Sequence, residues 1–221
     1  HEEVLNTLCE KFTFPDRHNA QIRVNTPDTP VQETKYIETS SNVNTSYAMF
    51  GWLGPKANEL KAGICLDLIS IIFGDGSSSR LQQNLIEKLP ERIFNIISSE
   101  HYQFKDGNNF FIQANFASES KDKAIELIKQ ELANLLNNRI TEEELLKAKK
   151  RMKSRFAFGA ETVSEIGETI GYYMTVCDDL KLIEEYLADL DSIQIADLED
   201  TIRKYLAIEN AVISVLVPER K

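Results

Sequence analysis

The sequence predicts an α+β domain, in which a mixed or antiparallel sheet carries helices packed on one side. Two observations lead to this class. Two strand-like segments, two helices, a hairpin, several more helices and one closing strand follow one another, which differs from the regular alternation of parallel α/β folds. In addition, 42% of the 221 residues are hydrophobic, which is ample for a core.

The first strands are expected near the beginning of the chain. TKYIET at 34–39 and NTSYAMFGWL at 44–53 are rich in β-branched and aromatic residues, and Gly54-Pro55 ends the second of them. Before them, residues 2–12 have apolar side chains at helical spacing, and a stretch with three prolines follows. This pattern indicates the end of a helix and then an extended linker.

Two helices should come next. Residues 58–73 carry leucines and isoleucines at helical spacing and are expected to form a buried helix that ends at Gly74. A shorter helix should begin at Ser78 or Ser79 and run to about Leu89.

A hairpin and a helical region complete the pattern. Strands at 92–104 and 108–118 are separated by Lys105-Asp106-Gly107, a sequence that suits a tight turn. Helices are expected over 121–137, from the capping box Thr141-Glu142-Glu143-Glu144 to about residue 158, and within 163–206. The apolar run AVISVLVP predicts a final strand that ends at Pro218.

Charge and cysteine content exclude several classes of protein. The net charge of −10 disfavours nucleic acid and anionic membranes as partners, and no segment approaches the length of about 20 apolar residues that a membrane span needs. Much of the charge lies between Asp178 and Asp200, where nine acids face one lysine. Cys9, Cys65 and Cys177 are odd in number and far apart, so neither a disulfide framework nor a cysteine metal site is expected.

The stretch Gly74-Asp75-Gly76-Ser77-Ser78-Ser79-Arg80 looks like a phosphate loop, but it lacks the lysine of that motif and follows a helix rather than a strand. It is better explained as a helix end, a turn and the cap of the next helix. His1, His18 and His101 are isolated from one another, so the chain offers too few ligands for a zinc site of its own. The basic run 147–155 fits ion pairs within its helix, such as Glu143 with Lys147.

The sequence resembles the pitrilysin/insulinase family of inverted zincin metallopeptidases, which includes the mitochondrial processing peptidases. The run from Phe73 to Leu81 is similar to the family signature G-x-x-x-S-S-R-L, and a helix and long hairpin follow it. The strand pair ending at Gly54-Pro55, the capping-box helix and the closing strand occur in the family's order. The signature residues are Gly74, Gly76, Ser78, Ser79, Arg80 and Leu81.

The resemblance implies a domain of the metalloenzyme LuxS/processing-peptidase-like fold. In this family one domain carries H-x-x-E-H and a distant glutamate, and a homologous partner domain binds no metal. Because H-x-x-E-H is absent here, the resemblance implies the C-terminal, non-metal-binding domain over 34–221, preceded by the last helix of another domain at 1–14 and a linker at 15–33. Zinc is then expected in that other domain or in a partner subunit, and no cofactor in this chain.

The family usually continues its signature with an arginine and a tyrosine that help to hold substrate. The arginine position corresponds to Ile86 here and the tyrosine position most nearly to Phe94, with Arg92 as a candidate substitute. Isoleucine and phenylalanine lack the hydrogen-bonding groups of arginine and tyrosine. Arg80 is expected to stabilise the fold rather than to contact a ligand.

Three functions therefore stay open. The domain forms half of a peptide-binding chamber opposite a zinc domain of an active peptidase, or it belongs to an inactive subunit paired with a zinc-bearing chain. In both cases its partners are that zinc domain or subunit and an extended peptide, with a homodimer or heterodimer as the full-length form. The third candidate is an interaction module whose acidic segment 178–200 binds a basic partner.

Overall fold

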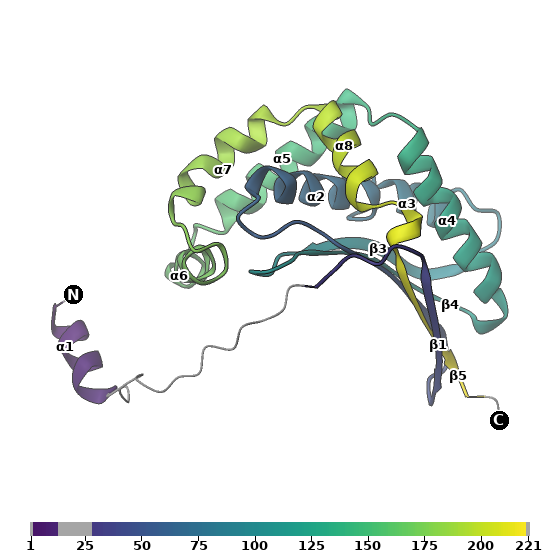
Figure 1. Ribbon diagram of the computed structural model, residues 1–221, viewed down its shortest axis with the longest axis horizontal. Helices are drawn as coiled ribbons and strands as arrows, with labels where there is room; N and C mark the ends of the chain where they lie inside the picture. Colours follow the sequence, from purple (N-terminus) through teal and green to yellow (C-terminus); the bar gives the residue numbers. More distant parts are fainter. Residues whose placement is uncertain (1, 13–27, 220–221) are drawn as a thin grey trace.

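A curved five-stranded sheet with helices over one face forms the main body of the structure (Figure 1). The computed structural model describes residues 2–12 and 28–219. The five strands are β1 (Lys35–Ser41), β2 (Ser46–Leu53), β3 (Phe94–Tyr102), β4 (Asn109–Phe116) and β5 (Val212–Pro218). Their order in the sheet is β1-β5-β2-β4-β3, so the closing strand lies between the first two.

The sheet is mixed, because β1 pairs with β5 in parallel while the other neighbouring pairs are antiparallel. Along β4, Phe110, Ile112, Ala114 and Phe116 are buried, and the residues between them are partly exposed. This alternation places one face of the sheet in the core and leaves the other, the free face, with no described helix packed on it (Figure 1). The predicted α+β class, with a mixed sheet and helices on one side, is confirmed.

Helix α2 (Leu60–Phe73) lies between the sheet and the outer helices, and almost all of its residues from Gly63 onward are buried. The short α3 (Arg80–Gln82) continues into a π-helical turn, Gln83–Glu87, where a continuous α-helix was expected. The outer helices are α4 (Lys121–Asn137), α5 (Glu142–Phe158), α6 (Val163–Tyr172), α7 (Lys181–Ser192) and α8 (Ile195–Tyr205).

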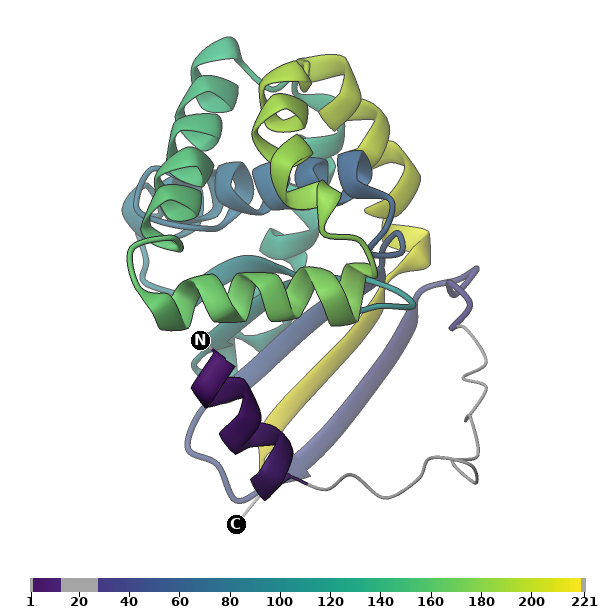
Figure 2. The ribbon, with the colours of Figure 1, turned by 90° about the vertical axis from the view of Figure 1, so that its left-hand side faces the viewer.

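Figure 2 shows how α6 differs from the other outer helices. It crosses in front of the helical layer and none of its residues is buried, whereas α4, α5, α7 and α8 each bury at least one residue. A complete capping box from Thr162 and Glu165 begins α6, which supplies local stability that packing does not.

The predicted N-terminal helix is present as α1 (Glu2–Lys11), and none of its residues is buried. Most of the predicted linker, 15–33, lies outside the described residues, so the division into domains stays a prediction. A search of the described helices finds no segment with the length and hydropathy of a membrane span.

Candidate functional site

The signature turn joins α2 to α3, and its two glycines meet steric demands. Gly74 lies so close to β3 that a Cβ atom there would be 2.2 Å from the backbone nitrogen of Ser99. Gly76 has a φ of 97°, in the left-handed region that favours glycine. Ser79 is the N-cap residue of α3, Leu81 is fully buried, and Ser78 is exposed. Gly74 therefore allows the backbone of α2 to approach β3 closely, and Gly76 allows the left-handed conformation of the turn.

Arg80 connects this turn to the start of α5. Its Nε and Nη2 atoms donate to the two carboxylate oxygens of Glu144 at 2.7 and 2.9 Å. Nη1 donates to the carbonyl of Asn138, and Nη2 also donates to the carbonyl of Arg139. Burial alone would raise the pKa of the Glu144 carboxyl, but the bonds from Arg80 and Thr141 outweigh it and lower that pKa to about 2. These contacts connect Arg80 to α5 and to the residues before it, and its expected role in stabilising the fold rather than contacting a ligand stays a prediction.

The basic run of α5 is also used within the fold. Arg151 donates to the carbonyl and carboxylate of Asp75, and Arg155 contacts the other carboxylate oxygen of the same residue. The expected pair of Glu143 and Lys147 forms at 2.8 Å. These contacts occupy both arginines of the run and leave an anion-binding role without support.

The three candidate substrate-contacting residues lie in different environments. Phe94 is fully buried at the start of β3, and its ring packs edge-on against Phe116. Ile86 is half-buried in the π-helical turn and packs against the core. Arg92 is exposed in the loop between them. Of the three, only Arg92 has a largely solvent-accessible side chain in this structure.

The side chain of His101 is fully buried, and its Nδ1 lies 2.7 Å from a carboxylate oxygen of Asp67. Its Nε2 has no hydrogen-bond partner among the described residues. His1 and His18 lie outside the described residues. Within 2–12 and 28–219, no group of three or more histidine, cysteine, aspartate or glutamate residues is placed to hold a metal ion.

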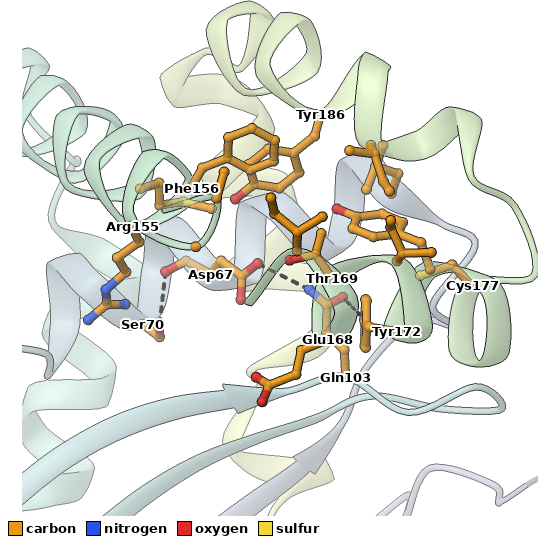
Figure 3. Close-up of a pocket in the computed structure, with 18 of the residues that line it drawn as sticks. Asp67, Ser70, Gln103, Arg155, Phe156, Glu168, Thr169, Tyr172, Cys177 and Tyr186 are labelled. Carbon is orange, nitrogen blue, oxygen red and sulfur yellow. Dashed lines mark hydrogen bonds between the residues drawn. The ribbon is translucent and has the colours of Figure 1, made fainter. Parts of the chain in front are cut away.

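A pocket of about 810 Å³ lies between α2, α5, α6 and α7 and was not expected from the sequence (Figure 3). Its size falls in the roughly 300–1,000 Å³ range of small-molecule sites. Most of its lining is apolar or aromatic. The main apolar contributors are Ile71, Met152, Phe156, Ile166, Ile170 and Tyr186.

A chain of polar side chains lines one side of this pocket. Asp67 on α2 accepts a 3.1 Å hydrogen bond from the amide of Gln103, and the Gln103 oxygen accepts one from the Tyr172 hydroxyl (Figure 3). Three segments that are distant in sequence, namely α2, the connection that follows β3 and α6, are thereby joined. Partial burial raises the pKa of Tyr172 and Tyr186, so both phenols are neutral near pH 7.

The free face of the sheet offers a second, shallower site. Tyr47, Met49 and Ile96 expose 47%, 42% and 63% of their surface there. Between them and the amides of Gln113 and Asn115 lies a hollow of about 390 Å³. The face thus combines apolar side chains with groups that donate and accept hydrogen bonds.

This fold is found in solved structures of peptidases. A crystal structure of a protease from Helicobacter pylori superimposes with a TM-score of 0.83 at 22% identity, covering 98% of this chain and 52% of that one. The peptidase M16 inactive domain from Pseudomonas fluorescens does so with a TM-score of 0.76 at 19% identity, covering 91% of this chain and 47% of that one.

Residues 1–152 match the family model described as the peptidase M16 inactive domain, so the chain belongs to that family. An uncharacterized zinc protease of Rickettsia felis is 27% identical over 174 residues, which are 77% of this chain and 42% of that protein. The chain therefore spans less than half the length of this relative. The resemblance to the non-metal-binding domain of zinc metallopeptidases is confirmed.

Proposed function

We propose that this domain forms the non-catalytic half of a peptide-binding chamber, opposite a zinc-bearing domain of the same protein or of a partner subunit. The free face of the sheet is the observation that carries the proposal. Tyr47, Met49 and Ile96 stay exposed although their size suits burial, and Gln113 and Asn115 stand among them. Such a surface suits an extended peptide, which has both apolar side chains and backbone hydrogen-bonding groups.

Hydrolysis in this proposal belongs to the zinc domain. Zinc there would activate a water molecule, while this chain would hold the peptide and exclude bulk water. Relatives of this chain are named as zinc proteases, which supports zinc-dependent peptide hydrolysis as the activity of the complete protein. Ile86, Phe94 and Arg92 remain proposed contributors, and exposure makes Arg92 the one best placed to meet a peptide directly.

The proposal is tested by changing the free face in the complete, zinc-bearing protein. Ile96→Asp should raise the KM for an unfolded peptide by about tenfold, because burying a carboxylate against the peptide opposes binding, while kcat changes little. Leu146→Asp is the matched control, since Leu146 is 69% exposed on α5 in the helical layer. Equal KM values for both variants and an unchanged melting temperature would overturn the proposal.

An inactive subunit is the second form of this proposal. Ile86 and Phe94 replace the two polar residues usual in the family, which favours a domain that no longer assists catalysis directly. The two forms are separated by the parent gene: an H-x-x-E-H sequence encoded before His1 predicts cleavage by the single chain with zinc, and its absence predicts that cleavage needs a second, zinc-bearing chain.

The acidic segment 178–200 gives weaker support to an interaction module. Several of its acids already pair with bases of the same chain: Asp191 with Lys153 at 2.5 Å, Asp197 with Lys61 at 2.7 Å. Binding through the remaining acids should weaken steeply between low and physiological salt, whereas peptide binding in a chamber should not.

A further inference from the structure

The pocket under α6 combines an apolar wall with an acidic floor, and this combination restricts the ligand that fits it. We infer that it binds a primary ammonium group on an apolar stem, as in a lysine side chain or the first residue of a peptide. This site is separate from the free sheet face to which the proposed function assigns the peptide. It can therefore be tested without assuming that function.

The acidic floor is the carboxylate of Asp67. One oxygen accepts a hydrogen bond from His101 at 2.7 Å and the other accepts one from Gln103 at 3.1 Å. Each carboxylate oxygen has a further lone pair, and the side chain keeps 25% of its surface exposed. Asp67 can therefore accept another donor from within the pocket.

The other charged groups of the pocket add to this preference. Glu168 contributes a second carboxylate from the exposed helix α6. Arg155 is the one base among the described residues that line the pocket, and it already pairs with Asp75. The pocket thus has more negative than positive charge available to a ligand, which favours a cation and opposes an anion.

The aromatic lining suits a cation with an apolar stem. The rings of Phe156 and Tyr186 stack with centroids 5.1 Å apart, and those of Tyr172 and Tyr173 meet edge-on at 5.3 Å. Faces of neutral aromatic rings attract cations, and their carbon surface binds a hydrocarbon stem. A purely apolar ligand would remove water from the exposed part of the Asp67 carboxylate without supplying a donor in its place, at a cost in binding free energy.

The first experiment compares a matched pair of small ligands, 2-phenylethylamine and 2-phenylethanol, with the 221-residue chain at pH 8. The amine is protonated there, since alkylammonium groups of the lysine type have a pKa of about 10.4. We expect the amine to bind about tenfold more tightly than the alcohol, with amide chemical-shift changes at Gly159, Thr169 and Ile170, which line the pocket. Equal affinity, or shifts elsewhere in the chain, would overturn the inference.

Variants then identify the group that selects the charge. Asp67→Asn should remove most of the tenfold preference for the amine, and Glu168→Gln should reduce it. Asp122→Asn is the control, because its side chain is 97% exposed on α4 and does not line the pocket. Asp67→Asn removes a charge next to the buried side chain of His101, and this change can unfold the domain. Glu168 is exposed, so Glu168→Gln tests the inference even if Asp67→Asn unfolds. An undiminished preference in Glu168→Gln and in folded Asp67→Asn would contradict the inference.

Two peptide sources of the ammonium group are distinguished with a second matched set. An acetylated pentapeptide with a central lysine is compared with its norleucine analogue, and each is also made with a free amino terminus. Binding that follows the lysine, or binding that follows the free terminus, identifies the source. If the small amine binds but no peptide does, the inferred site stands and a role for it in peptide binding fails. Peptide binding that Ile96→Asp abolishes and Asp67→Asn leaves intact would support the proposed function and not this pocket.

Discussion

Replacing Gly74 with alanine should destabilise the domain by about 3 kcal/mol, as overpacking in a tight core does. The added Cβ would lie 2.2 Å from a backbone nitrogen of β3, and backbone cannot move aside as a flexible side chain can. Urea unfolding measures the effect. Gly167→Ala is the control, because a Cβ there meets no atom of the described residues within 4 Å and alanine favours a helix. A Gly74 variant as stable as the wild type would contradict the close approach.

The carboxyl of Glu144 should make stability depend on pH in the acid range. Its pKa falls from 4.5 to about 2 on folding, so the folded state binds fewer protons than the unfolded state between these values. The contribution is complete above about pH 4.5 and is lost as the pH falls through 2. Melting temperatures of the wild type and Glu144→Gln should therefore differ at pH 7 and converge towards pH 2. If the melting temperatures of the two proteins differed by the same amount from pH 7 to pH 2, the ionised Glu144 carboxylate would not contribute to stability in this way.

Among the elements, α6 should unfold locally before the rest of the domain. No residue of α6 is buried, so its capping box is a large part of what holds it. Thr162→Ala should cost about 1 kcal/mol and speed amide exchange over 163–172 while leaving α2 protected. Thr141→Ala, which removes the equivalent box of α5, should instead lower the melting temperature, because α5 buries Leu145, Ala148 and Met152. Faster exchange throughout the chain in Thr162→Ala would contradict local unfolding.

Most elements of this fold are predictable from local sequence. The period-two pattern of Phe110 to Phe116 and the Thr141 capping box each depend on neighbouring residues, and the structure has the expected strand and helix there. The tight turn expected at 105–107 is instead part of a longer connection, because β3 ends at Tyr102 and β4 begins at Asn109. The π-helical turn at Gln83–Glu87 was missed because no residue pattern separates it from an α-helix.

The pocket could not be predicted, because its wall comes from residues as distant as Asp67, Gln103 and Tyr186. One available signal was Asp67, an acidic residue within the mostly buried part of α2. A charged side chain in such a place needs a hydrogen-bonding or charged partner, so its position indicates a polar contact inside the fold. That partner, His101, is on a strand 34 residues away. The sequence pattern predicts which residues share a face of one helix or strand, but it does not predict which helices and strands pack against each other.

For the whole molecule, the order of the strands in the sheet predicts that the C-terminal strand is needed for stability and that the N-terminal helix is not. β5 is the last element described, yet it pairs with both β1 and β2 and buries Ile213 and Val215 in the core. Removing residues 212–221 should therefore separate β1 from the sheet, expose the core and abolish cooperative thermal unfolding. Removing residues 1–12 should leave the melting temperature within about 1 °C, because no side chain of α1 is buried. Calorimetry measures the thermal unfolding of the two truncated chains. Cooperative unfolding after the loss of β5 would contradict the prediction, because it would show that the other described strands form a stable sheet without β5.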